Sequence, residues 1–415
     1  MERRWELLAP AGDAAALSAA LKAGADAVYF GIDAFNMRQR ARNFALADLP
    51  RIRTMTRDAG ARAYLAMNTI VFEEEIGALE TVLDAASAAG IDAVIAWDPA
   101  VIRGARRREL EVHLSTQASV SNSAGIIEAY ERHGIRRFVL ARECGLDRID
   151  AIRRALTEQL GPRADRIELE AFVHGAMCVS ESGRCFLSEF STGDSGNRGA
   201  CLQPCRRRYR IIDVEGEYEF EMGEDYILSP RDLCTLPFLE KILDSGIRVL
   251  KIEGRMRNPE YVSTVVGVYR EALDFWIEGD PGDTAAWEAL KEAGLLRLRS
   301  VYNRGFSSGF YMGRPIGDWT EAPDSQATRR KETVGIVVNY FRRIGVAEIK
   351  VQSAGFSLGD ELMIQGPTTG SLAFTVNSME IDQQPVRRAE RVESVTVEVP
   401  GRVRRNDAVY RRFDA

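Results

Sequence analysis

The sequence predicts an α/β protein: a (β/α)8 TIM-like barrel with a long cysteine-bearing insertion, followed by a small C-terminal all-β barrel domain. Three observations lead to this prediction. Short apolar runs alternate with helical stretches through residue 270, five of the six cysteines fall in one long gap between two runs, and the pattern changes after residues 329–331. Alternating strands and helices imply a parallel sheet with right-handed crossovers.

Eight candidate strands follow one another along the first part of the chain. They are residues 6–10, 27–31, 63–68, 93–98, 112–116, 138–142, 167–172 and 249–254. The stretches between them, such as 14–23 and 76–89, carry apolar residues at helical spacing. Eight such units suit a closed barrel. An open doubly wound sheet is the alternative, and the absence of G-x-G-x-x-G after the first strand disfavours it.

The predicted domains are a barrel over residues 1–300, a linker over 301–332 and a β domain over 333–415. The cysteine-bearing insertion covers residues 173–245, and insertions of that length are usually functional. In the last domain, strands are expected at 334–340, 346–351, 361–364, 395–399 and 408–410. Short strands separated by glycine-containing turns are typical of a compact β-barrel.

Composition limits the class of protein. No apolar run is long enough to span a membrane, and residues 1–6 lack the apolar core of a signal peptide. A cytoplasmic protein with no membrane partner is therefore expected, and its cysteines should not form disulfides. The net charge of −6 argues weakly against a protein that coats nucleic acid. The basic segment at 205–210 nevertheless predicts RNA contact, with Arg206 and Arg207 binding the substrate.

Polar residues that follow the predicted strands are candidates for the site, because barrel active sites lie at the carboxyl ends of the strands. The candidate catalytic residues are His174, Arg142, Glu143, Lys251, Glu253 and Arg255, and the candidate substrate contacts are Asn68, Asp98, Ser115, Thr116 and Gln117. Simpler roles remain open. Asp98 precedes a proline and would suit a helix cap, Ser115 or Thr116 could satisfy loop backbone, and His174 could be a packed histidine.

The cysteine spacing is Cys178-x6-Cys185-x15-Cys201-x3-Cys205-x28-Cys234. Grouped thiolates indicate a soft metal or a cluster. Structural zinc sites usually contain two tight C-x2-C pairs, whereas these cysteines are scattered over long loops, so an iron–sulfur cluster is favoured. Zinc and incidental cysteines are the alternatives. Cys144 lies outside the group and is expected to be a buried, inert thiol.

A longer motif covers the first of these cysteines. Residues 170–188, EAFVHGAMCVSESGRCFLS, match E-x-F-x-x-G-[SA]-[LIVM]-C-x4-G-x-C-x-[LIVM]-S at every defined place. This is the signature of peptidase family U32, and the sequence resembles that family through both domains. Further family-like segments are residues 6–12, 198–206, 229–234 and 251–255.

The resemblance carries functional expectations. The family is named for peptidase or collagenase activity, but better understood members hydroxylate RNA or ubiquinone without oxygen, and the quinone proteins carry a [4Fe–4S] cluster on four cysteines. By position, the resemblance implies Cys178, Cys185, Cys201 and Cys234 as ligands. Cys205 is an alternate fourth ligand, because one quinone protein uses a C-x3-C pair similar to Cys201 and Cys205.

The resemblance is greatest to the members that make 5-hydroxyuridine at the tRNA wobble position. It implies prephenate as an oxygen donor, and the β domain resembles translation-factor barrels, which fits RNA. A small anion would suit Arg142, Lys251 and Arg255.

Three functions remain open after the sequence is read. The favoured one is an RNA hydroxylase that acts on RNA, in particular tRNA, together with a small anionic co-substrate. A peptidase is the second, although the chain has no H-E-x-x-H or G-x-S-x-G, and with three histidines a Cys–His pair would use His174. The third is a non-enzymatic cluster-bearing partner or scaffold. The oligomeric state stays open.

Overall fold

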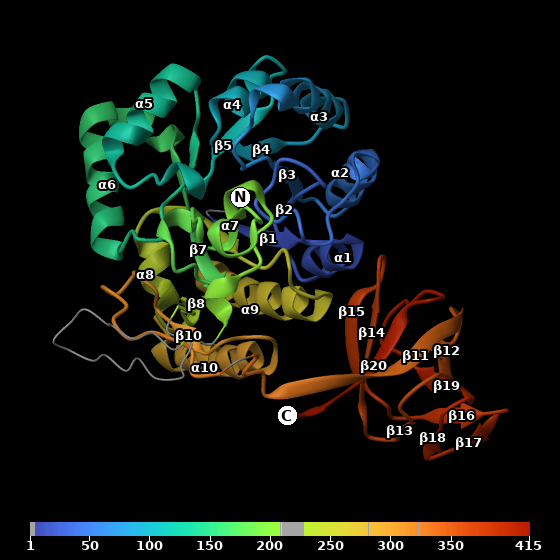
Figure 1. Ribbon diagram of the computed structural model, residues 1–415. Coiled ribbons are helices and arrows are strands. Elements are labelled where there is room, and N and C mark those ends of the chain that lie inside the picture. The colour runs from blue at the N-terminus through green and yellow to red at the C-terminus, as the bar shows by residue number, and fades with distance from the viewer. Residues whose placement is uncertain (1–4, 208, 210–227, 281, 323) are drawn as a thin grey trace.

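The computed structural model describes residues 5–207, 209, 228–280, 282–322 and 324–415. Its first part is a closed barrel of eight parallel strands, which confirms the prediction (Figure 1). β9 closes the barrel because it pairs in parallel with both β1 and β7. The barrel strands are β1 (Glu6–Ala11), β2 (Ala27–Phe30), β3 (Arg62–Ala66), β4 (Ala93–Ala96), β5 (Glu111–Leu114), β6 (Arg137–Val139), β7 (Glu168–Gly175) and β9 (Ile247–Ile252).

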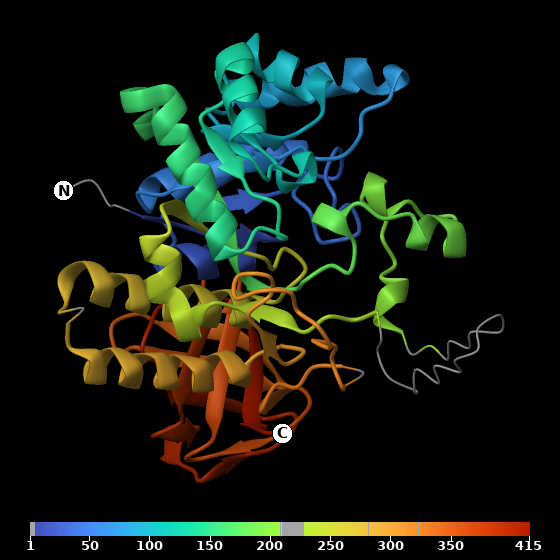
Figure 2. The same ribbon diagram turned by 90° about the vertical axis from the view of Figure 1, so that its left-hand side faces the viewer.

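Helices follow the strands and cover the outside of the barrel (Figures 1 and 2). They are α1 (Ala14–Lys22), α2 (Leu49–Asp58), α3 (Ile76–Ala88), α4 (Pro99–Arg106), α5 (Ser123–His133), α6 (Leu146–Leu160), α8 (Leu239–Asp244), α9 (Pro259–Glu278) and α10 (Thr284–Ser300). Side-chain caps begin several of them; Asp13 caps α1 and Asn258 caps α9. Among the described residues, no helix combines the length and apolarity needed to cross a bilayer.

The cysteine-bearing insertion lies at the carboxyl end of β7. It contains the short helix α7 (Leu187–Thr192), which stands beside the barrel in Figure 2, and the strand β8 (Asp232–Cys234). β8 pairs antiparallel with the end of β7, where Cys234 lies opposite His174. The insertion therefore folds back onto the barrel before α8 and β9 resume the alternating pattern.

The segment predicted as a linker is packed against the barrel. β10 (Phe306–Ser307) pairs in parallel with β8, and the Tyr311 hydroxyl donates to the Phe172 carbonyl at 2.7 Å. One apolar core contains residues between Trp5 and Val301, and a separate core contains residues between Val334 and Val409.

The C-terminal part is the expected all-β domain. Eight strands form one antiparallel sheet in the order β15-β14-β20-β11-β12-β19-β16-β17, and β13 (Phe356–Ser357) pairs with β18 (Arg388–Ala389). The sheet strands are β11 (Arg329–Phe341), β12 (Val346–Val351), β14 (Glu361–Gly366), β15 (Gly370–Thr375), β16 (Met379–Ile381), β17 (Gln384–Pro385), β19 (Ser394–Glu398) and β20 (Ala408–Asp414). In β12, Ala347, Ile349 and Val351 are buried at alternate positions, as a half-buried strand requires.

Specific contacts join the β domain to the barrel. Ser18 and Lys22 of α1 donate to the carbonyls of Pro367 and Thr369, at 2.6 and 2.8 Å. On α9, Glu260 pairs with Lys331 and Arg412, at 3.0 and 3.1 Å. These polar contacts hold the β14–β15 hairpin against α1, and β11 and β20 against α9.

Candidate functional site

Four cysteines of the insertion line one cavity at the mouth of the barrel. Cys178, Cys185, Cys201 and Cys205 surround a volume of about 80 Å³. Backbone N–H groups already point at two of the sulfurs: Leu187 N donates to Cys185 Sγ at 3.3 Å, and Gln203 N donates to Cys201 Sγ at 3.4 Å. As they stand, no three His, Cys, Asp or Glu side chains of the described residues form the ligand group of a single metal ion.

The thiols of this cavity differ in acidity. Burial would raise the pKa of Cys178, but hydrogen bonds with Ser180 and the charges of Arg142 and Arg38 lower it overall. Burial raises the pKa of Cys205 to about 11, and the neighbouring Cys178, Cys201 and Cys185 also raise it. Cys178 is therefore a more acidic thiol than Cys205, and it lies next to two arginines.

Cys234 and His174 lie elsewhere. The Cys234 thiol is buried in β8, and burial raises its pKa to about 12. The ring of His174 is enclosed by Tyr261, Tyr269 and Phe306, with centroid separations of 5.6 to 6.1 Å. Burial lowers the pKa of His174 to about 3, so the ring is neutral. Neither residue lines the four-thiol cavity, so His174 has the environment of a packed histidine.

A second, smaller cavity of about 40 Å³ lies in the barrel centre, and a single carboxylate organises it. Glu253 pairs with Arg38 at 3.2 Å, and Arg142 lies at 3.9 Å. Burial opposes ionisation of Glu253, but Arg38, Arg142 and Arg255 outweigh burial and lower its pKa to about 2. Three arginines against one carboxylate leave this cavity positive.

Lys251 and Arg255 also line the central cavity, and both are held by neighbours. Lys251 Nζ lies 2.6 Å from Glu170 Oε1 and 4.6 Å from the centre of the Tyr29 ring. Arg255 donates to Asn36 Oδ1 at 3.1 Å. Burial, with a smaller effect from Arg38, lowers the pKa of Arg255 to about 10.

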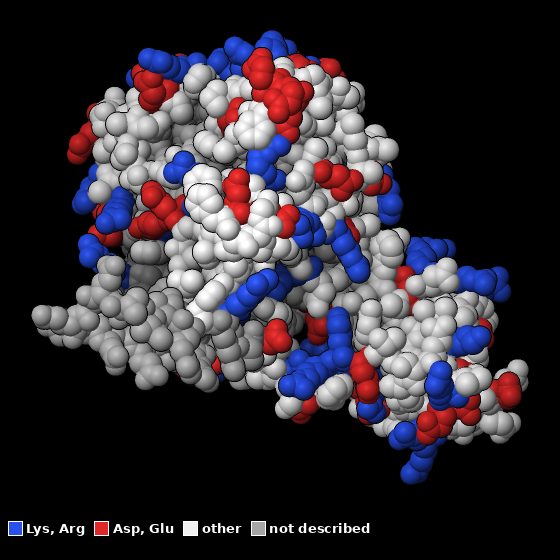
Figure 3. Space-filling view, viewed as in Figure 1, with Lys and Arg blue, Asp and Glu red and all other residues white. Residues whose placement is uncertain are grey.

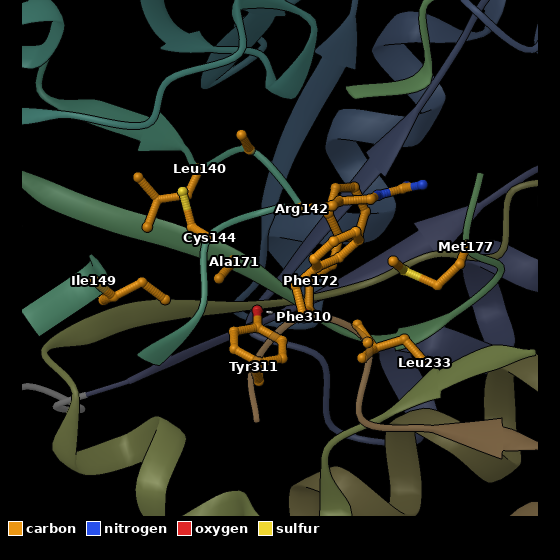
Figure 4. Close-up of a pocket in the computed structure, with 12 residues that line it drawn as sticks. Leu140, Arg142, Cys144, Ile149, Ala171, Phe172, Met177, Leu233, Phe310 and Tyr311 are labelled. Carbon is orange, nitrogen blue, oxygen red and sulfur yellow. Dashed lines mark hydrogen bonds between the residues drawn. The ribbon is translucent and has the colours of Figure 1, made fainter. Parts of the chain in front are cut away.

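Arg142 rests on an apolar support. Its guanidinium carbon lies 4.2 Å from the centre of the Phe172 ring. Figure 4 shows the guanidinium pointing away from the apolar pocket that Cys144, Tyr311 and their neighbours form behind it. That pocket has a volume of only about 10 Å³, so it is packing rather than a ligand site. Cys144 is buried there, as expected, and burial raises its pKa to about 11.

The remaining predicted residues fall into two groups. Ser115, Thr116, Gln117 and Asn68 line the central cavity, and Asn68 Nδ2 donates to Gln117 Oε1 at 2.9 Å. Asp98 instead caps α4, and Glu143 accepts the Ser182 N–H at 2.8 Å. Glu143 thus anchors the loop that carries Cys178 and Cys185, and neither acid lines the cavities described above.

A third cavity, here called the arginine groove, has a volume of about 310 Å³ and opens beside the thiols. Figure 3 shows Lys and Arg side chains gathered around a hollow on this face, below α7. Arg206 lines the groove but donates to Ser229 Oγ and Pro230 O, at 2.7 and 2.9 Å. Arg207 is exposed, and positions 208 and 210 of the basic segment lie outside the described residues.

The three cavities meet at one point, because Met37, Arg38 and Arg142 line all of them. Sequence reasoning missed Arg38, although it follows the second strand, as the other candidates follow theirs. It also missed Arg257, Tyr302 and Arg304, which line the groove and come from segments after β9 and α10. In the sequence, each of these three residues is only an arginine or an aromatic residue in a loop. Such residues are too common in this chain for the sequence to identify these three.

Two motif glycines are explained by close backbone approach. A Cβ at Gly175, whose φ is +109°, would lie 2.4 Å from the Glu253 carbonyl oxygen. A Cβ at Gly199, whose φ is +87°, would lie 2.2 Å from the Asn36 carbonyl oxygen. Only glycine fits at either place, so the cysteine-bearing segments can lie directly against the barrel mouth.

Comparison with known proteins agrees with this architecture. The chain is 41% identical over 415 residues to a protein named Collagenase from Porphyromonas gingivalis, covering 99% of this chain and 98% of that protein. It is 33% identical over 383 residues to tRNA hydroxylation protein P1 of Bacillus subtilis, covering 91% and 87% of the two chains. It is 29% identical over 423 residues to tRNA hydroxylation protein P of Escherichia coli, covering 90% and 89%.

The family model described as Peptidase family U32 matches residues 12–321, which include seven of the eight barrel strands and all four thiols of the cavity. The match covers most of the chain, and the relatives extend it through the β domain. This chain therefore belongs to peptidase family U32.

Proposed function

We propose that this protein is an iron–sulfur-dependent, oxygen-independent RNA hydroxylase that acts at C5 of a tRNA wobble uridine. One observation supports the proposal most: four thiols line one cavity, and that cavity meets an arginine-lined barrel centre at Arg38 and Arg142. A cofactor and an anionic co-substrate would therefore lie side by side. The relatives named for tRNA hydroxylation suggest the substrate class, and such a reaction would take place in the cytoplasm.

The residues that would hold a [4Fe–4S] cluster are Cys178, Cys185, Cys201 and Cys205. Their cavity is larger than one ion requires, which suits a cluster better than zinc. The N–H groups of Leu187 and Gln203 would hydrogen-bond cluster-ligating sulfurs, and Arg38 and Arg142 would offset the negative charge. When bound, the cluster would supply either electron transfer or a Lewis-acidic iron.

The oxygen donor would bind where the central cavity opens into the arginine groove, because the central cavity alone, at about 40 Å³, is too small for it. Converting C–H to C–OH removes two electrons from the carbon. An organic anion such as prephenate would supply the oxygen at the hydroxide level when it aromatises with loss of CO2, which is redox-neutral, so a separate two-electron acceptor other than dioxygen would take the electrons. Arg142 and Arg255 each have a buried Nε that lacks a hydrogen-bond partner among the described residues, and a carboxylate would satisfy both.

Peptide hydrolysis is a second candidate, because the relative at 41% identity is named Collagenase. A Cys–His mechanism needs a histidine within reach of a thiol. None of the described histidines lines the four-thiol cavity or the arginine groove, and His174 is enclosed by aromatic rings. The geometry therefore favours hydroxylation over this form of proteolysis.

The cluster can be tested by purifying the protein without oxygen. The wild type should be brown, absorb at about 400 nm and contain iron and acid-labile sulfide. Cys205→Ala should lose most of the colour and iron, whereas Cys234→Ala should keep both, provided that circular dichroism shows both variants folded. The opposite result would make Cys234, and not Cys205, the fourth ligand. A colourless protein that contains zinc would refute the cluster.

The reaction can be tested in a strain that lacks the gene. Nucleoside mass spectrometry of tRNA and rRNA should show that this strain lacks a hydroxylated pyrimidine. The wild-type gene should restore that nucleoside, and the Cys178→Ala gene should not. Gelatin cleavage by the same purified proteins is the parallel assay. Cleavage that depends on Cys178, with unchanged nucleosides, would overturn the proposal in favour of a peptidase. No change in either assay would leave a non-enzymatic scaffold.

A further inference from the structure

The arginine groove is the largest of the three cavities that meet at the barrel mouth, at about 310 Å³ against about 80 and 40 Å³. Pockets of about 300 Å³ and above accept molecules of nucleotide size, and the other two are too small. Cys178, Cys201 and Cys205 line both the groove and the thiol cavity. A ligand in the groove would therefore reach the thiols.

The groove is strongly positive. Its described lining contains six arginines and one acid, Glu253. Arg38 and Arg142 face Glu253, and Arg304 pairs with Asp232 at 3.4 Å. Among the described residues, neither Arg206 nor Arg257 has an acidic partner within salt-bridge distance, but the Arg206 guanidinium donates to Ser229 Oγ and Pro230 O, so Arg257 has the less engaged guanidinium of the two.

Arg257 is also held in place. Its guanidinium carbon lies 3.5 Å from the centre of the Tyr302 ring, and that of Arg304 lies 5.2 Å from the same ring. A guanidinium stacked on an aromatic ring loses little freedom when its N–H groups bind a forked acceptor. A phosphate matches such a group in geometry and charge.

We propose that the groove binds one unstacked nucleotide of an RNA loop, with the phosphate on Arg257 and the base directed toward the thiols, and that Tyr302 positions Arg257. This inference rests on the proposed function, because it identifies how that substrate is bound. An acidic peptide would also be attracted by charge, but the stacked Arg257–Tyr302 pair favours a planar base next to a phosphate.

The test is binding of a fluorescein-labelled pentauridylate to the full-length protein, measured by anisotropy at several salt concentrations. Arg257→Gln should weaken binding about 10-fold or more, as expected for a charge-assisted contact, and should reduce the salt slope by about 0.7. Tyr302→Leu should weaken binding several-fold, whereas Tyr302→Phe keeps the ring and should bind as the wild type does. Arg154→Gln removes an exposed arginine from α6 and is the matched control.

Each outcome has a defined meaning. The proposal is overturned if the wild type does not bind the oligonucleotide, if Arg257→Gln behaves as Arg154→Gln does, or if pentaglutamate displaces the RNA equally well. Nucleoside analysis separates the two levels. If the wild type hydroxylates RNA and Arg257→Gln changes neither binding nor hydroxylation, only the groove assignment is refuted. If Arg257→Gln selectively weakens RNA binding but the wild type has no hydroxylase activity, only the proposed reaction is refuted.

Discussion

The buried ion pair between Lys251 and Glu170 joins two motif segments, and its replacement tests whether Lys251 is structural or catalytic. The two charged atoms are 2.6 Å apart, and their side chains are 5% and 0% exposed. Lys251→Met would leave the Glu170 carboxylate buried, and its Oε2 already lacks a hydrogen-bond partner among the described residues. Breaking a buried pair from one side costs about 3–5 kcal/mol.

Replacing both partners should be much less harmful. Lys251→Met with Glu170→Leu removes both charges, and such replacements are often neutral or stabilising. At roughly 2–4 °C per kcal/mol, the single variant should melt about 6–20 °C below the wild type, and the double variant should recover most of that loss. Thermal melting followed by tryptophan fluorescence measures both.

Activity separates the two roles. Because the Lys251 ammonium is already engaged, we expect the folded double variant to hydroxylate RNA within about tenfold of the wild type, well short of the 10²–10⁴-fold loss typical of a missing general acid or base. A double variant that melts as low as the single one would refute the stability reasoning. A stable double variant without activity would make Lys251 catalytic.

Two further predictions concern stability. The pKa of Glu253 is lowered from 4.5 to about 2, so its ion pairs stabilise the fold above about pH 4.5 and lose that effect as the pH falls toward 2. Urea titrations should show that Glu253→Gln is about 3 kcal/mol less stable than the wild type at neutral pH, and that this difference is smaller at pH 3. A difference in stability that does not change with pH would contradict the prediction. A Cβ at Gly370 (φ +71°) would lie 2.8 Å from Ala19 N, whereas Gly359 (φ +88°) has nothing within 4 Å. Gly370→Ala should therefore lower the melting temperature more than Gly359→Ala and loosen the β domain, as measured by limited proteolysis, and equal effects would show that the domain contact is unimportant.

The barrel was predictable because its signals are local. Each strand is a short apolar run, and each crossover has helical spacing, so all eight strands could be placed from the sequence. Asp98 illustrates the same point at the level of one residue. Its position before Pro99 signals a helix cap, and in the structure it accepts the Ala100 N–H at 2.8 Å.

The cysteines show where local signals end. Spacing alone treats Cys205 and Cys234 alike, but β8 turns back antiparallel to β7 and places Cys234 opposite His174. That pairing depends on a contact between distant segments, which no periodicity encodes. Four of the five grouped thiols therefore line one cavity, and tertiary pairing removes the fifth from it.

The charges at the barrel mouth argue for a particular kind of co-substrate. Arg38, Arg142 and Arg255 come from loops after β2, β6 and β9, so they are brought together only by closure of the barrel. Glu253 offsets one of these charges and orients two of the guanidiniums, which leaves a local excess of two positive charges. A neutral ligand would leave that excess uncompensated, whereas a dianion would balance it. This is the charge that the proposed dicarboxylate oxygen donor would carry, and a donor bound here would lie beside Arg38 and Arg142, which also line the four-thiol cavity.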